Sequence, residues 1–502
     1  MIEETASQMP QMNMHKLHSL IRYIKESNIG VKGIVVLKNG AVAAEAYNYP
    51  HHSEVHYDMQ NCTMAVISAL VGIAIDQGCI GSVNSVISPF FPDFFTHNEA
   101  GSREKSKITV ENLLEMSSGL EWNDIVFSQS NSLYQLWSTD NKIDFILERP
   151  MSHEPGSKYN HNLGGIHLLS VILQKAVGMP VPSFALEKLF RPLGIEAPQW
   201  DEDNRNIALG FYGLHLRLKD AAKIGQLYLQ KGRWNGKQII SEQWIEASTR
   251  KRRETPNGPW SFYGCGYVWN MNRFGGYCVK SLQGNSLFVL PKYSMVVVIT
   301  GSLLPQQLQL HETLIETYLL PAARLHAAGD KVKLSLAQEQ LKSLIKDMAS
   351  PPEPDKPRPL PRTAYRISGV TYHMENTIAE ESFTFYFAEI QECKLCVKMY
   401  GKDYEITIGL DNIYRYSRGD CCKGFWENSN TFVMDKRVLD SHSSFRYIFR
   451  FEKDRLNVKI TAGPDGAEAG AAEGTAERTA KETEKETKKL NEYKKYVKEV
   501  QI

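Results

Sequence analysis

The chain carries almost no net charge. Its 502 residues include 58 lysines and arginines against 57 aspartates and glutamates, which leaves a formal net charge of +1. No segment interleaves a block of basic residues with aromatic ones, a pattern typical of nucleic-acid-binding surfaces. A balanced charge also provides no attraction to an anionic membrane surface. We therefore expect neither a nucleic acid nor a membrane as a partner.

Long apolar segments are missing as well. The N-terminus, residues 1–8, is acidic and has no apolar core of the kind that a secretory signal needs. The apolar run at residues 65–78 is too short, and too rich in glycine and alanine, to span a bilayer. We predict a cytoplasmic protein, or an exported one if the natural chain begins further upstream.

Signatures of cofactors are equally scarce. The chain contains no phosphate-binding loop, no H-E-x-x-H and no dinucleotide fingerprint. Among its eight cysteines, Cys393 and Cys396 together with Cys421 and Cys422 have the composition of a four-thiolate zinc site. Residues 394–400 alternate like a strand, however, so a spacing of three places Cys393 and Cys396 on opposite faces. We expect free buried thiols, no metal and no cofactor.

Residues 12–325 are predicted to form one α+β domain. Apolar residues recur at helical spacing over residues 14–24, and an Asn-Gly turn joins two short strands within residues 33–47. Strands are expected again at residues 263–269 and 286–300, followed by a helix over 308–325. Strands at both ends of the segment with helices between them predict an antiparallel sheet flanked by helices.

The rest of the chain differs in composition. Residues 326–363 are predicted to hold a helix and a proline-rich linker, extended and solvated over residues 350–361. Short apolar runs separated by turns over residues 364–461 predict a small β-barrel or sandwich. Glutamate, lysine, alanine and threonine dominate residues 462–502, where we predict a charged tail that is helical or disordered.

Five ordered segments of the first domain resemble a known family. They are Gly72-Ile-Ala-Ile-Asp-Gln-Gly78, Leu113-Leu-Glu-Met-Ser-Ser-Gly-Leu-Glu-Trp122, Glu154-Pro-Gly-Ser-Lys-Tyr-Asn-His-Asn-Leu-Gly-Gly165, Gly213-Leu-His-Leu-Arg-Leu-Lys-Asp-Ala-Ala-Lys-Ile-Gly225 and Gly232-Arg-Trp-Asn-Gly-Lys-Gln-Ile-Ile240. Residues 12–325 thereby resemble the serine β-lactamase and penicillin-binding-protein-like hydrolases of the class C β-lactamase, DD-peptidase and esterase type. Residues 364–461 are similar to the lipocalin-like C-terminal module of some relatives. The resemblance implies the β-lactamase/transpeptidase-like fold.

The same resemblance implies an active-site helix that begins with S-x-x-K. In that family the serine attacks a carbonyl carbon, and the lysine one turn later helps to accept the proton. Here Asn61-Cys62-Thr63-Met64 stands in that place, with Asn61 at the serine position and Met64 at the lysine position. An amide is not an acyl-transfer nucleophile, and a thioether takes up no proton at neutral pH. The resemblance therefore predicts the fold without the activity.

The second family motif, Tyr-x-Ser/Asn, is also altered. Its tyrosine moves protons and its last residue binds substrate. The corresponding residues here are His161, Asn162 and Leu163. The Leu163 side chain offers no hydrogen bond, whereas His161 has a pKa in the range useful for proton transfer. His161 either fills the volume of the tyrosine or carries a proton, and no carboxylate that would orient its ring is identifiable from the sequence.

The third family motif is K-T-G or H-x-G on a strand. The corresponding segment, residues 281–285, is Ser-Leu-Gln-Gly-Asn, in which only Gly284 fits. Lys280 shares a strand face with Leu282 because the two are two residues apart, and we expect its side chain in solvent. Cys62 is a rescue candidate for the lost nucleophile, although it lies about a quarter-turn round the helix from the former serine position.

The altered residues are predicted to line a mixed polar and apolar pocket made of Asn61, Met64, His161, Asn162, Leu163, Leu282, Gln283 and Asn285. Three interpretations remain open. The first is a catalytically degenerate homologue, or pseudoenzyme, whose former active-site cleft binds a small acyl compound, a peptide or a protein partner, including a homo-oligomer or an active paralogue. The second is a working hydrolase or repurposed catalyst that uses Cys62 or His161. The third is a structural assembly subunit.

Overall fold

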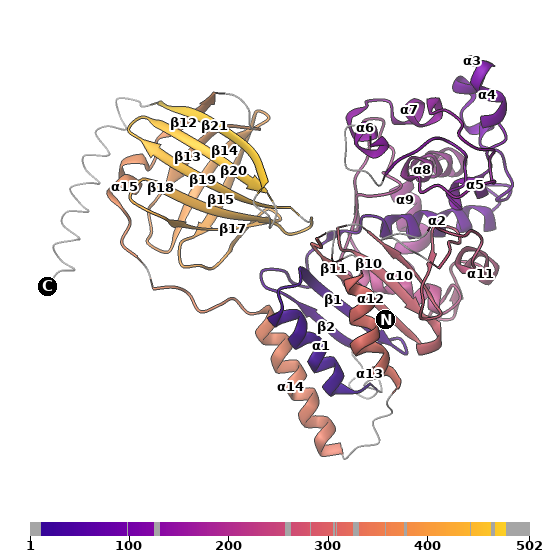
Figure 1. The fold of residues 1–502 in the computed structure, drawn as a ribbon, viewed down its shortest axis with the longest axis horizontal. Helices are drawn as coiled ribbons and strands as arrows, with labels where there is room; N and C mark the ends of the chain where they lie inside the picture. Colours follow the sequence, from indigo (N-terminus) through magenta and orange to yellow (C-terminus); the bar gives the residue numbers. More distant parts are fainter. Residues whose placement is uncertain are drawn as a thin grey trace. The chain divides into compact units, whose positions relative to one another are not determined.

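The contacts of the chain divide it into two compact units, residues 1–349 and 350–502. Each unit contains its own sheet and its own helices (Figure 1). The structure is a computed structural model, and it describes residues 12–97, 99–124, 131–256, 263–281, 283–304, 307, 309–324, 331–356, 358–375, 379–441, 443–462 and 467–477.

The first unit is built on a six-stranded sheet in which all neighbouring strands are antiparallel. The strand order is β2-β1-β11-β10-β9-β8. The strands are β1 (Val31–Lys38), β2 (Ala41–Tyr47), β8 (Asn270–Met271), β9 (Tyr277–Lys280), β10 (Ser286–Leu290) and β11 (Met295–Gly301). Asn39 and Gly40 both have positive φ, at 52° and 81°, as a tight turn between β1 and β2 requires. The predicted antiparallel sheet flanked by helices is confirmed.

The strand expected at residues 263–269 is wrong. Only Cys265 makes isolated bridges there, and β8 forms this edge of the sheet, next to β9. The backbone of Gly266 packs against α11 (Glu242–Thr249), where an added Cβ would lie 2.2 Å from the Ser248 carbonyl oxygen. Because its backbone packs against α11, the segment 263–269 does not pair as a strand of the sheet.

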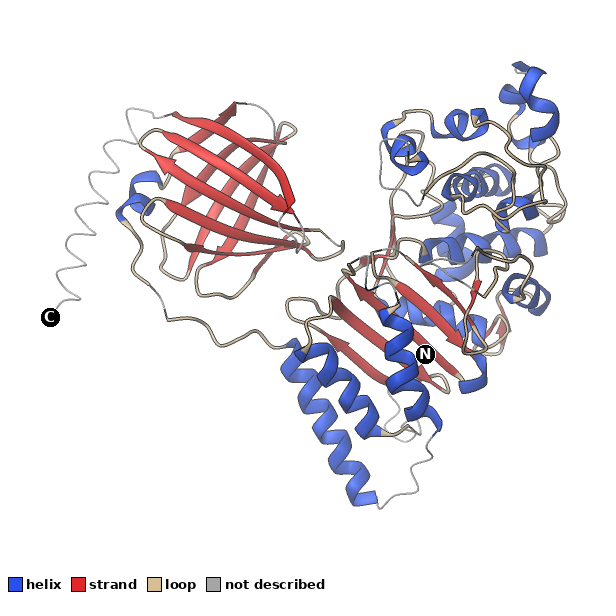
Figure 2. Cartoon of the chain, viewed as in Figure 1, coloured by secondary structure: helices blue, strands red, loops and turns tan. Residues whose placement is uncertain are grey.

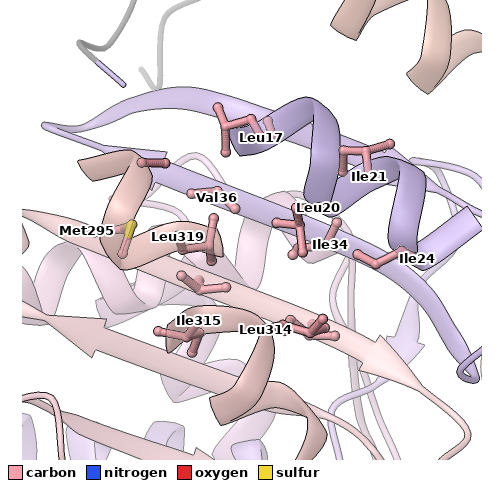
Figure 3. Packing of buried hydrophobic residues seen from close by; sticks show 14 of the residues in the cluster. Leu17, Leu20, Ile21, Ile24, Ile34, Val36, Met295, Leu314, Ile315 and Leu319 are labelled. Carbon is pink, nitrogen blue, oxygen red and sulfur yellow. The ribbon is translucent and has the colours of Figure 1, made fainter. Parts of the chain in front are cut away.

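One face of the sheet is covered by helices from the two ends of the unit. These are α1 (Met14–Glu26), α12 (Leu310–Leu314), α13 (Leu320–Arg324) and α14 (Lys331–Ala349), with a π-turn at Ile315–Leu319 between α12 and α13. Figure 3 shows Leu17, Leu20, Ile21 and Ile24 of α1 facing Ile34 and Val36 of β1, beside Leu314, Ile315 and Leu319. These apolar contacts join the first and last segments of the unit.

Other helices carry the functional positions. α10 (Leu218–Leu229) packs on β1, β10 and β11, while α2 (Cys62–Asp76) packs on α8 (Leu163–Val177) and on β9 (Figure 2). Every residue of α2 from Cys62 to Ala74 is buried, so this helix is apolar on all sides, as the centre of a domain requires. The other helices of this part are α3 (Pro92–His97), α4 (Glu99–Lys105), α5 (Val110–Leu114), α6 (Ser132–Ser138), α7 (Lys142–Glu148) and α9 (Val181–Ala185).

Within the described ranges, no single helix has both the length and the apolar character to cross a membrane. Two helices joined at a bend of 75°, Leu163–Val177 and Val181–Phe190, are together long and apolar enough, judged by length and composition alone.

The second unit contains α15 (Arg362–Ile367) and a ten-stranded sheet, in which a parallel pairing of β15 with β17 supplements the antiparallel order β15-β14-β13-β12-β21-β20-β19-β18-β17-β16. Phenylalanines at alternate positions, such as Phe383, Phe385, Phe449 and Phe451, form its core. The strands are β12 (Thr371–Glu375), β13 (Glu380–Tyr386), β14 (Glu392–Met399), β15 (Lys402–Gly409), β16 (Arg415–Ser417), β17 (Asp420–Trp426), β18 (Thr431–Val438), β19 (Ser444–Glu452), β20 (Arg455–Ala462) and β21 (Ala467–Glu477).

The prediction of a helical or disordered tail from residue 462 is wrong for its first part. Ala467–Glu477 forms β21, which pairs with β12 on one side and with β20 on the other. A strand between two others gains backbone hydrogen bonds on both edges, so small and polar side chains suffice there. Residues 478–502 lie outside the described residues. The predicted solvated linker also has an anchor, because Leu360 is only 6% exposed and belongs to the core of the second unit.

The contact of α1 with the sheet gives a stability prediction. Leu20 is fully buried in this core, and Leu20→Ala should lower the free energy of unfolding by about 2–5 kcal/mol through lost burial and a residual cavity. Chemical denaturation measures the change. Arg22→Ala, on the exposed face of the same helix, should change it by less than about 0.5 kcal/mol. Equal effects of the two substitutions would contradict this packing.

Candidate functional site

Asn61 lies at the N-terminus of α2, where the family carries its nucleophile. Its Nδ2 donates to the carbonyl oxygen of Lys280 at the end of β9, at 3.1 Å. Asn61 is 8% exposed, and its Oδ1 is buried with no hydrogen-bond partner among the described residues. The amide therefore joins the helix to the sheet and still has an acceptor to offer.

The next residues of α2 are packed rather than activated. Met64, at the former lysine position, is 1% exposed. The Cys62 Sγ lies 3.7 Å from the carbonyl oxygen of Val279, and complete burial raises the pKa of this thiol far above its usual range. Since a nucleophilic cysteine needs a lowered pKa, the surroundings of Cys62 oppose thiolate chemistry.

A network of side-chain amides joins α2 to the turn between β9 and β10. Gln60, held at a left-handed φ of 49°, accepts from the Ser281 hydroxyl and donates to the amide oxygen of Gln283. The Asn285 Nδ2 donates to the Asp58 carbonyl oxygen at 2.6 Å. These contacts place Gln283 and Asn285 next to the segment that precedes α2, whereas Leu282 lies outside the described residues. That these residues line a ligand pocket stays a prediction. Sequence reasoning missed Gln60 and Asp58, which carry no family signature.

His161 has a carboxylate partner that the sequence did not reveal. Its Nδ1 lies 3.2 Å from Oδ2 of Asp124, and the same oxygen accepts from the Leu163 backbone N–H at 3.0 Å. The Trp122 indole N–H donates to the other carboxylate oxygen. Asp124 is 5% exposed, so a buried, fully partnered carboxylate orients the histidine ring.

The position of Asp124 follows from the packing of Trp122. The Trp122 ring lies against Gly164 at the start of α8, where an added Cβ would be 2.5 Å from the ring. Trp122 and Gly164 are 42 residues apart in the sequence, and no local pattern links them. The link between Asp124 and His161 is therefore tertiary.

Asn162 has a structural task and a spare donor. Its Oδ1 caps α8 by accepting from the Gly165 N–H at 2.8 Å, which is ordinary N-capping. Its Nδ2 is buried without a partner among the described residues. Leu163, in contrast, is 2% exposed and packs in the interior.

Tyr212 lies between the two groups of site residues. Burial raises the pKa of its phenol strongly, and the nearby carboxylates of Asp124 and Asp58 raise it further. Asp58 belongs to the amide network and Asp124 to the histidine pair, so the two groups lie within electrostatic reach of one ring. The ring of Tyr212 also stacks on the exposed Trp137, with centroids 6.4 Å apart. Sequence reasoning missed both aromatic residues, because neither belongs to a recognised motif.

The expectation that Lys280 is solvent-exposed is wrong. Its side chain is 7% exposed and forms an ion pair with Glu312 of α12. Lys280 shares a strand face with Cys278, and α12 covers that face. Beside this pair, His311 Nδ1 lies 2.8 Å from the Ser286 hydroxyl, and burial together with the charge of Lys280 lowers the pKa of His311 to about 3. The charge of Lys280, the cation nearest to the third motif, is therefore compensated by Glu312 under α12.

A family model named Beta-lactamase matches residues 20–314, more than half of the chain. The chain belongs to the beta-lactamase family. Membership agrees with the fold, and it leaves open what this beta-lactamase family member does with its altered residues.

Known relatives of this beta-lactamase family member are distant. An N-acetylmuramyl-L-alanine amidase from Bacillus subtilis (strain 168) is 23% identical over 180 residues, which cover 32% of this chain and 41% of the relative. Two solved structures share the fold: EstCE1, a hydrolase with promiscuous acyltransferase activity (15% identity, 61% of this chain, 99% of that chain, TM-score 0.50), and a family VIII carboxylesterase (13%, 63%, 99%, 0.50). The chain spans about two fifths of the length of the amidase.

The buried His311 gives a pH prediction. Its pKa of about 3 lies below the usual value of 6.5, so the unfolded chain binds this proton as the pH falls while the native protein does not. The free energy of unfolding should therefore fall between pH 6.5 and about 3. Denaturation at several pH values should show a shallower fall for His311→Gln than for the unaltered protein. Identical slopes for the two proteins would contradict a buried neutral imidazole.

Proposed function

We propose that this beta-lactamase family member has given up serine acyl transfer and binds a small acyl compound or short peptide in the former active-site cleft. The observation that carries the proposal is that two buried amide atoms, Asn61 Oδ1 and Asn162 Nδ2, have no hydrogen-bond partner among the described residues. Asn61 stands at the former nucleophile position, and Asn162 directly follows His161 at the former tyrosine position.

The loss of acyl transfer follows from the side chains that replace the reacting groups. Asn61 supplies no nucleophilic oxygen, and Met64 takes up no proton. The lysine nearest to the third motif is paired with Glu312, so its charge is already compensated. Restoring any one of these groups would leave the others missing.

Binding of an amide or acyl group follows from the unpartnered atoms. Buried polar atoms in native proteins almost always have a hydrogen-bond partner, and each exception requires an explanation. A ligand with an N–H group would satisfy the acceptor of Asn61, and one with a carbonyl group would satisfy the donor of Asn162. Amides and peptides carry both groups. The relatives are named amidase, carboxylesterase and acyltransferase, and all three names concern acyl groups.

The binding proposal is tested with Asn162→Asp. This substitution keeps the oxygen that caps α8 and replaces the spare N–H donor with an acceptor. N-acylated amino acids and dipeptides should raise the melting temperature of the unaltered protein, because a ligand that binds only the native state stabilises it. The shift should disappear in Asn162→Asp and persist in Asn84→Asp, an exposed matched control. Equal shifts in both variants, or none in the unaltered protein, would overturn the proposal.

A second function is favoured by one specific contact, the pairing of His161 with the buried Asp124 at 3.2 Å. A histidine oriented by a carboxylate is a common general base. The His161 side chain is 25% exposed and therefore open to a small molecule. In this alternative the protein is a repurposed catalyst that transfers a proton without forming an acyl-enzyme.

Hydrolysis assays separate the two functions. With p-nitrophenyl esters and anilides we expect no turnover and no covalent adduct by intact-protein mass spectrometry, because the nucleophile is missing. Turnover that survives in Cys62→Ala but is lost in both His161→Phe and Asp124→Asn would establish the repurposed catalyst. Turnover lost in Cys62→Ala, with an adduct on that residue, would instead identify a working cysteine hydrolase.

A further inference from the structure

The second unit contains a cavity of about 640 Å³ that has no counterpart in the functions discussed above. It lies between the described residues 355–356 and 358–361 of the proline-rich segment and strands β17, β18 and β19. Its volume falls within the range of small-molecule sites, about 300–1,000 Å³.

The wall formed by the proline-rich segment is anchored at both ends. The Asp355 N–H donates to the Asp411 carbonyl oxygen at 2.8 Å, and the Leu360 side chain is buried in the core of the unit. Just beyond it, the Thr363 hydroxyl donates to the Asn430 amide oxygen at 3.0 Å. Proline restricts the backbone between these anchors, so the cavity is largely pre-formed.

Positive charge prevails among the residues that line the cavity. Lys356, Arg358, Lys423 and Arg446 face only Asp355 and Asp435. Asp435 is occupied by Arg446, whose Nε and Nη2 donate to its two oxygens at 2.6 and 2.9 Å. Lys356 and Arg358 have no ion pair within the described part of the chain. The lining therefore has an excess of uncompensated cations.

Lys423 is held by two neutral side chains. Its Nζ donates to the amide oxygen of Asn412 at 2.6 Å and lies 5.0 Å from the centroid of the Tyr414 ring. Burial lowers the pKa of Lys423. The carboxylates of Asp435 and Asp355 attract Lys423 through space, while its direct contacts are neutral. A partly desolvated ammonium group of this kind favours an anion that can approach it.

Aromatic surface accompanies the charge. Phe425 lines the cavity with half of its surface exposed, at 49%. Trp426 lines it too, and its indole Nε1 is a buried donor without a partner among the described residues. A large exposed aromatic side chain next to an unused donor is typical of a binding surface for flat apolar groups with an acceptor.

A second cavity in the same unit, of about 330 Å³, provides a contrast. Two pairs of its charged and polar side chains bond to each other, Lys436 with Asp420 at 2.7 Å and Tyr447 with Glu380 at 2.8 Å. Internal pairing leaves these groups little to offer a ligand. The uncompensated cations of the larger cavity therefore distinguish it as a candidate site.

We propose that the cavity between residues 355–361 and strands β17–β19 binds a small organic anion that carries an acidic group on an aromatic body. The acidic group lies near Lys423 and the arginine and lysine of the proline-rich segment. The aromatic body lies against Phe425 and Trp426. A carboxylate and a phosphate share the charge that this lining recognises.

The experiment uses the full chain with 8-anilinonaphthalene-1-sulfonate, a fluorescent aromatic anion, and with N-phenyl-1-naphthylamine, which has the same rings without the charge. Fluorescence titration should give saturable binding of the anion and much weaker binding of the neutral dye. Lys423→Met should weaken binding of the anion by about tenfold, as the loss of a charge-assisted contact does. Competition by phenyl phosphate and by benzoate shows which acidic group the site prefers.

Two further variants keep the test decisive. Arg358→Gln removes an exposed cation of the lining and should weaken binding even if Lys423→Met fails to fold. Lys402→Met, an exposed lysine of β15 outside the cavity lining, is the matched control and should leave binding unchanged. Equal affinity for the two dyes, an equal effect of Arg358→Gln and Lys402→Met, or a lack of competition by both phenyl phosphate and benzoate would overturn the proposal.

Discussion

The burial of α2 on all sides is the constraint on which the first unit depends. Thirteen consecutive residues of this helix, Cys62–Ala74, are buried against α8 and the sheet. Gly72 admits the Trp244 ring, since an added Cβ would lie 2.5 Å from it. Such packing fixes the axis of the helix, and with it the place of Asn61 beside the end of β9. The altered site keeps its geometry because apolar contacts hold it.

Because apolar contacts hold the fold, it persists although the residues at the predicted motif positions are altered. The altered positions take part in the packing of the unit, since Met64 and Leu163 are 1% and 2% exposed. Their replacements take up roles of their own, since Asn61 bonds to the sheet and Asn162 caps a helix. Amide side chains suit this exchange, because each combines a donor with an acceptor. One half of each amide is used by the fold, and we propose that the other half is used by a ligand.

The two units differ in how the charged side chains discussed above are paired. In the first unit, the buried Lys280 pairs with Glu312, and the buried Asp124 contacts His161. In the second unit, the cations around the larger cavity outnumber the carboxylates that face them. Buried charges without partners are costly, and such an excess persists only at a surface that solvent or a ligand reaches. The excess of cations around this cavity therefore marks it as a candidate binding surface.

The sequence by itself determined the family and the antiparallel sheet with its helices, because these depend on local periodicity and on residue identity. Its resemblance to the family also predicts that Asn61 and Met64 stand where the family has Ser and Lys. Only the tertiary structure decided the pairing of Asp124 with His161, the burial of Lys280 under α12, the edge strand β8, and the strand Ala467–Glu477. Each of these depends on partners far away in the chain: a carboxylate 37 residues from its histidine, a helix that covers one strand face, or a gap between two strands that a weakly apolar segment fills. Local propensity carries no information about such partners, since long-range packing and backbone pairing select them.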